Sequence, residues 1–396
     1  MKQEPTRART TRADGAPALQ SREEVSLMLC GDVMTGRGID QILPHPLDPL
    51  LREPGSDDAR GYVALAEAAH GPVPRPAGFD WPWGDVLAAA ERFAPDVRLI
   101  NLETSVTRSS GFASGKAVHY RMSPENLPAL GALRPDACAL ANNHVLDFGR
   151  QGLLDTLDAL AAAGLRGVGA GRDAEEARRP AVITTAGGRV AVFSCGMASS
   201  GIPPDWAATA DRPGVQVLRD RAGTDADADN DDGLADRIRE QKRAGAVVVV
   251  SVHWGSNWGY DIDPDLVETA HALVDAGADL VHGHSSHHPR PIEVYRDRLI
   301  LYGCGDTVND YEGIPGYARF RDDLRLVYLA SVDAQRGNLV SLRMIPLRAR
   351  RLRLESALAT DADWLRATLD RVSHPFGVTV DRAPDGMLTV SATNPP

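Results

Sequence analysis

Short apolar runs alternate with amphipathic segments along most of the chain. The runs VSLMLC, VRLI, CAL, VVVVSV, DLV and LILYGC have the length and composition of buried strands. Between them, apolar residues recur at helical spacing, which predicts helices over 83–93, 149–164, 234–245, 264–277 and 361–373. The segment 180–195 contains Gly-Gly between two apolar runs and predicts a β-hairpin, as do residues 292–306. From Leu324 onward, apolar and polar residues alternate, which favours antiparallel strands.

This order of elements predicts one α/β sandwich over residues 25–350, because strands that alternate with helices form sheets covered by helices. Other open α/β folds fit the same order. Residues 1–24 are polar and rich in arginine, so we expect a disordered leader there. Residues 351–396 predict a C-terminal helix and a short strand that pack on the domain or trail it. The acidic run Asp225–Asp232 is interpreted as a solvated surface loop.

Polar side chains follow nearly every apolar run. Asp32, Glu103, the Asn142–His144 triplet, His253, the histidines of HGHSSHH and Asp306 each come directly after a predicted strand. Ligands of open α/β sheets gather at the carboxyl ends of the strands, so these side chains are expected to meet. Carboxylate, amide and imidazole together suit one or two divalent ions such as Mn, Fe, Zn, Mg or Ca. A turn or a surface loop explains any one of them alone, but not the whole set.

The composition narrows the class of protein. The net charge of −11 argues against nucleic acid or anionic lipid as the main partner. No run reaches the roughly 20 apolar residues of a membrane span, and residues 1–24 lack the apolar stretch of a secretory signal. The four cysteines lie in or beside apolar runs and are predicted to be buried free thiols. These features predict a cytoplasmic protein with no membrane span.

Six runs together resemble the capsule-synthesis CapA family. They are GDVMTGR, NLET, NNHVLDFG, HWG, GHSSHHPRPIEVY and YGCGDTVNDYEG, and the similarity extends from about Val25 to Ile314. The family is linked to poly-γ-glutamate biosynthesis and has a calcineurin-like metallophosphatase fold. The resemblance therefore implies a metallophosphatase-like α/β sandwich with a metal site at the C-terminal ends of its strands.

The resemblance also implies roles for single residues. Metal ligands are expected at Asp32, Glu103, Asn143, His253, His284 and His287, with Glu103 as the carboxylate that bridges two ions. His144 matches a transition-state donor, and Asp32, His144 and His287 are the expected catalytic residues. Two positions depart from the family of metallophosphatases. Met34 stands where those enzymes have a histidine ligand, and His-Ser-Ser-His replaces His-x-His, which leaves the choice between His282 and His287 open.

Three further residues are candidates for substrate binding. Arg37 follows Asp32 closely and is suited to an anionic group, although a surface salt bridge also explains it. Trp254 and Trp258 flank the loop after His253 and form either an apolar wall for a substrate or part of the core. The cluster from Asp306 to Glu312 supplies hydrogen bonds around the metal site, an acid or base, or simply a capped turn.

Three functions remain open at this point. The first is a metal-dependent hydrolase that attacks an amide of a peptide or poly-γ-glutamate-type substrate, or less readily a phosphate ester. The second, implied by the resemblance to lasso-peptide epimerases of the family, is a peptide epimerase in which Asp32 and one motif histidine move the α-proton. The third is a non-catalytic accessory protein for capsule synthesis. The sequence specifies neither the metal nor the oligomeric state.

Overall fold

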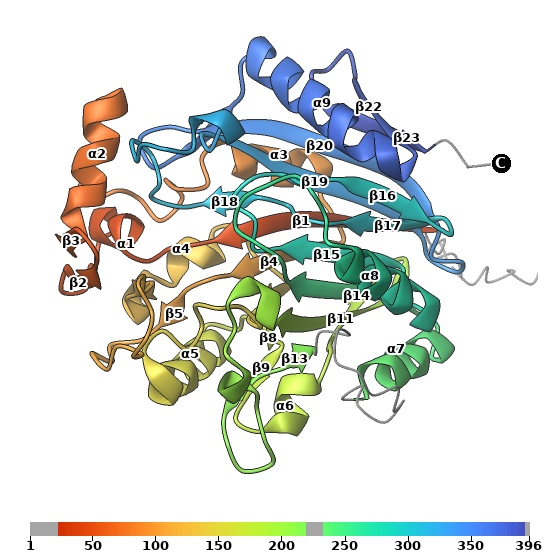
Figure 1. Ribbon diagram of the computed structural model, residues 1–396, viewed down its shortest axis with the longest axis horizontal. Coiled ribbons are helices and arrows are strands. Elements are labelled where there is room, and N and C mark those ends of the chain that lie inside the picture. Colours follow the sequence, from red (N-terminus) through yellow and green to blue (C-terminus); the bar gives the residue numbers. More distant parts are fainter. Residues whose placement is uncertain (1–22, 219–232, 393–396) are drawn as a thin grey trace, which may run out of the picture.

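The computed structural model describes residues 23–218 and 233–392. The predicted leader, except for Glu23 and Glu24, and the acidic run Asp225–Asp232 lie outside these ranges. The described residues form two large mixed β-sheets that pack face to face, with helices on their outer sides (Figure 1). The predicted α/β sandwich is therefore confirmed.

The first sheet combines a parallel and an antiparallel half. Its order is β22-β23-β20-β19-β1-β4-β7-β8, with β18 paired to β1 and β21 paired to β20. β1, β4, β7, β8 and β18 run parallel, whereas β19 and β20 pair antiparallel as the alternation after Leu324 predicted. The bounds are β1 (Glu24–Val33), β4 (Val97–Leu102), β7 (Ala137–Ala139), β8 (Gly167–Val168), β18 (Asp306–Val308), β19 (Leu324–Asp333), β20 (Leu339–Ala349), β21 (Leu354–Ser356), β22 (Val378–Arg382) and β23 (Leu388–Ala392).

The second sheet has the order β10-β11-β14-β15-β17-β16, with β13 paired to β11. β11, β14, β15 and β17 run parallel. Both predicted hairpins are present, β10–β11 and β16–β17. The bounds are β10 (Ala181–Thr185), β11 (Gly188–Met197), β13 (Val217–Leu218), β14 (Ala246–His253), β15 (Leu280–His284), β16 (Ile292–Tyr295) and β17 (Arg298–Leu301).

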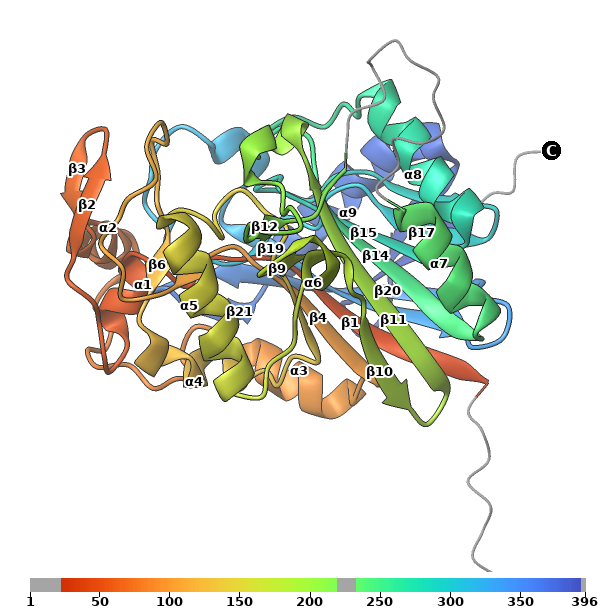
Figure 2. The same ribbon diagram turned by 90° about the horizontal axis from the view of Figure 1, so that it is seen from below.

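The helices cover the outer faces of the sheets. α3 (Asp85–Phe93), α4 (Pro128–Gly131) and α5 (Gly149–Ala162) pack on the first sheet, and α7 (Leu234–Arg243) and α8 (Pro264–Ala276) pack on the second. Figure 2 shows α3 and α8 on opposite sides of the sandwich. The remaining short elements are α1 (Gly38–Ile42), β2 (Leu50–Glu53), β3 (Ser56–Asp58), α2 (Arg60–His70), β5 (Ser105–Val106), β6 (Arg121–Met122), β9 (Ala170–Gly171), α6 (Ala174–Arg178) and β12 (Gly214–Val215).

Strand periodicity divides the core into layers. On β1, Leu27 and Leu29 point into the cluster between the two sheets, whereas Met28 and Cys30 point to the helices outside the first sheet. Successive side chains of a strand point to opposite faces, so β1 is apolar on both. A third cluster fills the space between the second sheet and α7 and α8. All four cysteines are buried thiols, as predicted.

The C-terminal region adds more to the sheet than the sequence suggested. α9 (Ala359–Ser373) is the predicted late helix. A single short strand was expected after it, but β22 and β23 form a pair, and β23 joins β20. Their segments are short and half polar, so only pairing with each other and with the existing sheet edge marks both as strands. None of the described helices is long and apolar enough to cross a membrane.

Candidate metal centre

Asp32 lies at the point where the two sheets meet. It ends the apolar run of β1, and the parallel register places it opposite Asp306 of β18 and Asn101 of β4. Its carboxylate accepts hydrogen bonds from Asn101 Nδ2 at 2.7 Å and from the backbone N–H of Ser285 at 3.1 Å. Burial and the Asp306 carboxylate raise the pKa of Asp32 to about 7. A fully buried carboxylate next to other carboxylates calls for a cation in the same place.

His253 and His284 face Asp32 from the second sheet. They end β14 and β15 and are partners in the parallel register, with 2.8 Å between their Nδ1 atoms. His284 Nδ1 lies 3.9 Å from Asp32 Oδ1, and Ser251 Oγ holds the other nitrogen of His284. Burial lowers the pKa of both imidazoles, which keeps them neutral and able to donate a lone pair. Ligand atoms of Asp32, His253 and His284 all lie within 4.8 Å of one another.

A second group shares Asp32 with the first. Ligand atoms of Asp32, His287 and Asp306 also lie within 4.8 Å of one another. His287 Nδ1 is 2.9 Å from Asp306 Oδ1, and Asn309 Nδ2 donates to Asp306 Oδ2 at 2.6 Å. Although burial opposes protonation, the Asp306 carboxylate raises the pKa of His287. Two groups of three ligands that share a carboxylate have the composition of a two-ion centre.

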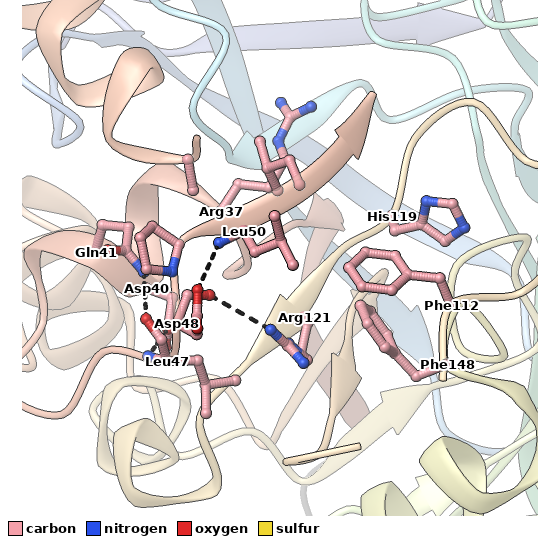
Figure 3. A pocket seen from close by; sticks show the side chains of 13 residues that line it. Arg37, Asp40, Gln41, Leu47, Asp48, Leu50, Phe112, His119, Arg121 and Phe148 are labelled. Carbon is pink, nitrogen blue, oxygen red and sulfur yellow. Dashed lines mark hydrogen bonds between the residues drawn. The ribbon is translucent and has the colours of Figure 1, made fainter. Parts of the chain in front are cut away.

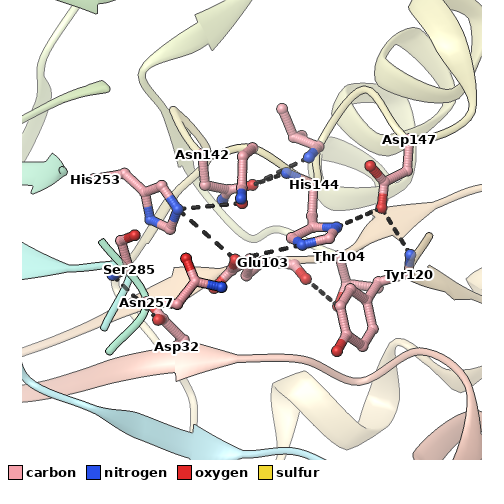
Figure 4. A network of polar contacts seen from close by, with 12 residues as sticks. Asp32, Glu103, Thr104, Tyr120, Asn142, His144, Asp147, His253, Asn257 and Ser285 are labelled. Atoms are coloured by element: carbon pink, nitrogen blue, oxygen red, sulfur yellow. Dashed lines mark hydrogen bonds and ion pairs between the residues drawn. The ribbon is translucent and has the colours of Figure 1, made fainter. Parts of the chain in front are cut away.

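Glu103, which directly follows β4, also favours bound divalent ions at this place. Its Oε1 lies 3.7 Å from His253 Nε2 and 3.8 Å from His144 Nε2. Figure 4 shows Glu103 between the two histidines. Its Oε2 is buried and has no hydrogen-bond partner among the described residues. An orphaned buried carboxylate oxygen is costly unless a cation binds it. The donor set of carboxylates and neutral imidazoles therefore fits divalent ions.

Asn143 and His144 close the centre on the side of β7. Asn143 Oδ1 lies 3.2 Å from His253 Nε2, which puts its amide oxygen within reach of the first group. His144 Nδ1 is 2.6 Å from Asp147 Oδ2, so its Nε2 is directed toward Glu103. Burial lowers the pKa of His144 to about 4. Asn142 shapes this turn by accepting from the backbone N–H groups of His144 and Val145.

The sequence did not decide which of His282, His284 and His287 bind metal, and the structure gives these histidines different surroundings. Both nitrogens of His282 are engaged, one with the carbonyl of Cys30 at 3.0 Å and one with Ser251 Oγ at 3.0 Å. It therefore lies outside both ligand groups, whereas His284 and His287 belong to one group each. The assignment of His284 and His287 as metal ligands stays a prediction.

Some neighbours of the centre were not singled out by sequence reasoning. Lys116 Nζ lies 2.6 Å from Asp147 Oδ1 and bonds to the carbonyl of Asn143, which fixes the turn that carries His144. Asp147 is part of the run NNHVLDFG, so a signal for it existed. Asp306 was predicted to lie among the polar strand ends, with its role left open between hydrogen bonds around the metal site, an acid or base, and a capped turn. Its pairing with Asp32 across β1 and β18 is not visible in the sequence.

Arg37 is not free to hold a ligand in this structure. Its buried guanidinium donates to Asp310 and to Glu53, at 3.0 Å for Glu53 Oε2, and lies 3.9 Å from the ring centroid of Tyr62. Figure 3 shows the guanidinium turned away from the aspartates that line a cavity of about 20 Å³ beside it. That volume is enough for roughly one water molecule. A substrate role for Arg37 stays a prediction that these pairings do not support.

The two tryptophans have different surroundings. Trp254 is fully buried in the cluster under α8, and its Nε1 donates to the carbonyl of Tyr302 at 2.9 Å, which gives it a packing role. Trp258 is half-buried, stacks on Tyr317 at 4.0 Å between ring centroids and lies 5.3 Å from the ring of His287. The predicted apolar wall beside the metal centre therefore depends on Trp258.

Comparison with known families identifies this architecture. The model of the bacterial capsule synthesis protein family PGA_cap matches residues 26–311. The chain belongs to this family. The resemblance seen in the sequence is thereby confirmed, and the strand ends that carry the candidate ligands up to Asp306 lie within the matched part of this PGA_cap protein.

Two relatives show how far the similarity extends. This PGA_cap protein is 56% identical over 367 residues to a probable polyglutamine synthesis accessory protein of Mycobacterium tuberculosis, covering 92% of this chain and 96% of the relative. It is 28% identical over 310 residues to the PGA biosynthesis protein CapA of Bacillus subtilis, covering 78% and 68% of the two chains. A crystal structure of a novel phosphatase from Mycoplasma pneumoniae aligns with TM-score 0.43 and 8% identity over 82% of this chain and 94% of that one. A structural similarity this low supports no conclusion about the function of this chain.

Proposed function

We propose that the chain is a metal-dependent enzyme of capsule or polyglutamate synthesis that acts on an amide of a peptide or poly-γ-glutamate-type substrate. The observation that carries this proposal is the sharing of buried Asp32 by two ligand groups next to the orphaned oxygen of Glu103. The names of the relatives, which refer to polyglutamine synthesis and PGA biosynthesis, support a polymer of glutamine or glutamate residues. Bound divalent ions at such a centre polarise a carbonyl oxygen and lower the pKa of water.

The side chains would hold the ions and move protons. Asp32, Glu103, Asn143, His253, His284, His287 and Asp306 are the residues that would hold the ions. Asp306 adds a carboxylate to the group of Asp32 and His287. His144 is the residue we assign to proton transfer at Nε2, because Asp147 holds Nδ1 and fixes the orientation of the ring. Trp258 and Tyr317 would position the chain of the substrate beside His287.

The test compares the wild type with Asp32→Asn on γ-glutamyl peptides and polymer, after loading with Mn, Zn, Fe, Mg or Ca. Asp32→Asn keeps the shape of the side chain and removes its charge. Turnover should fall by at least about 10²- to 10⁴-fold, the range typical of an acid or base group. If metal-loaded wild type leaves γ-glutamyl amides, peptides and phosphate esters unchanged, the enzymatic proposal fails and a non-catalytic accessory role is favoured.

Peptide epimerisation is the second candidate, and one feature of the site favours it. Two histidines are each bonded to a carboxylate, His144 to Asp147 and His287 to Asp306, which provides two separate positions for proton transfer. An epimerase must exchange the α-proton of its substrate with solvent. In deuterated water, one deuterium at the α-carbon of an intact peptide supports epimerisation, and cleavage without exchange supports hydrolysis.

A further inference from the structure

A cavity of about 610 Å³ lies where the loop after β14 meets the first turn of α8. Its size is within the range of small-molecule binding sites. The polar residues that line it are Ser199, Ser256, Asp261, Asp263, Asp265 and Arg290. The same loop contacts the metal centre, since His287 N–H donates to the carbonyl of Asn257 at 3.0 Å and Ser285 Oγ donates to that of Gly255 at 3.3 Å. The cavity therefore shares a wall with the segment that carries His287.

Arg290 is the unusual residue of this cavity. Its side chain is 2% exposed, and Nη2 donates to the carbonyl and hydroxyl of Ser256 at 2.7 and 2.8 Å. Its Nε is buried without a hydrogen-bond partner, and among residues 23–218 and 233–392 no carboxylate lies within ion-pair distance of the guanidinium, although the charge of Asp261 acts on it from farther away. The buried Arg37, in contrast, pairs with two carboxylates. A buried guanidinium without a counter-ion is unfavourable, and a ligand carboxylate that binds it removes that cost.

The mouth of the cavity has the opposite charge. Asp261 and Asp263 are exposed and Asp265 is half-buried. Asp263 is used in the structure, because its Oδ1 accepts from the N–H of Asp265 at the start of α8. Asp261, whose charge also acts on Arg290, and Asp265 are available for a cation. One buried cation behind two carboxylates is complementary to a ligand that bears both charges.

We propose that this cavity binds a zwitterionic α-amino-acid head group, with the carboxylate on Arg290 and the ammonium group beside Asp261 and Asp265. In a γ-linked glutamyl chain the first residue carries both groups on one carbon, whereas an α-linked peptide carries them at opposite ends. The cavity would therefore select the amino end of a γ-linked chain and place the following amides toward the metal centre. This choice of polymer rests on the proposed function, but the chemistry of the head group does not.

The test is calorimetric titration of the full chain, stripped of metal with a chelator, with γ-glutamylglutamate. N-acetyl-γ-glutamylglutamate and α-glutamylglutamate are the comparison ligands, because neither has the free head group. We expect the wild type to prefer γ-glutamylglutamate, and Arg290→Gln to weaken its binding by about 10- to 100-fold, the range for a charge-assisted hydrogen bond. The matched control, Arg366→Gln on the exposed face of α9, should bind as the wild type does.

Variants of the exposed rim residues provide a second test of the proposal if Arg290→Gln fails to fold. Asp261→Asn combined with Asp265→Asn should reduce the preference for γ-glutamylglutamate over its acetylated form, with an unchanged melting temperature. Equal binding of the three ligands by the wild type, or unchanged binding by Arg290→Gln or by the rim variant, would overturn the proposal. The titration uses metal-free protein, so its result does not depend on catalysis. If the ligand binds there but the metal-loaded protein shows no turnover, only the proposed enzymatic function is contradicted.

Discussion

At the level of single residues, the candidate centre depends on a few buried carboxylates. Their negative charges are compensated only when a cation is bound. Asp32, Glu103 and Asp306 bring three carboxylates together in the interior. Burial and the Asp32 carboxylate raise the pKa of Glu103 well above its usual value, because ionisation there adds charge to a site that already repels it. A bound divalent ion would relieve this repulsion, so the same three carboxylates favour its binding.

The first prediction concerns metal content. Glu103→Gln keeps the shape of the side chain but removes the charge, and His253→Gln removes an imidazole ligand. Each should lower the metal affinity by more than the roughly 10- to 100-fold typical of residues that only support a ligand. Elemental analysis after metal loading and dialysis measures the effect.

The control for this prediction is His271→Gln on α8, where the histidine pairs with Glu293 and stacks on Tyr295 away from the centre. It should retain the metal content of the wild type. Wild-type metal content in both Glu103→Gln and His253→Gln would contradict the metal centre as built here.

At the scale of the element, the position of Asp32 depends on how closely β1 approaches the segment before β18. A Cβ atom at Gly31 would lie 1.8 Å from the carbonyl oxygen of Gly305. Gly305 itself has φ of +76°, a conformation that favours glycine. The glycine in the Gly-Asp pair is therefore required by backbone contact between two strands, and the aspartate is held in place by the same contact.

The second prediction follows from that contact. Gly31→Ala should force β1 and β18 apart, lower the free energy of unfolding by about 1–3 kcal/mol and reduce metal binding. Gly61→Ala is the matched control, since no atom lies within 4 Å of its added Cβ and the residue lies in helix α2. That change should raise stability by up to about 1 kcal/mol. Chemical denaturation and metal content are the measurements, and equal behaviour of the two variants would contradict the argument.

At the scale of the whole molecule, the sandwich has three apolar clusters, one between the sheets and one under each helical layer. Each of the three clusters contains at least one of the four cysteines. Cys30 and Cys138 lie outside the first sheet, Cys304 lies between the sheets, and Cys195 lies under α7 and α8. Burial raises the pKa of Cys30 and of Cys138 to about 12, so neither forms the reactive thiolate at neutral pH.

The third prediction is that none of the four thiols reacts with a thiol-specific reagent such as DTNB in the native protein. All four should react after complete unfolding. Because the cysteines are divided among the three clusters, a single cooperative transition should expose them together. Rapid modification of one thiol under native conditions would show that its cluster opens independently of the others.

Much of the architecture was determined by the sequence alone. The apolar runs predicted the parallel strands, and the Gly-Gly pair and the alternation after Leu324 predicted the hairpin and the antiparallel strands. The polar residues at the strand ends predicted where a site forms, because the carboxyl ends of parallel strands share an edge. These features are local, since they depend on periodicity and on turn chemistry within a few residues.

The tertiary structure decided which side chains have partners and which are left to bind. His282 and His284 lie on the same face of β15, but His282 is engaged by Ser251 and by the carbonyl of Cys30, 252 residues away, and so lies outside the centre. Arg37 is neutralised by Asp310, 273 residues away, whereas no carboxylate among the described residues forms an ion pair with Arg290. Asp306 joins Asp32 through pairing of β1 with β18. Such partners are set by contacts between distant segments, and no periodicity in the sequence records them.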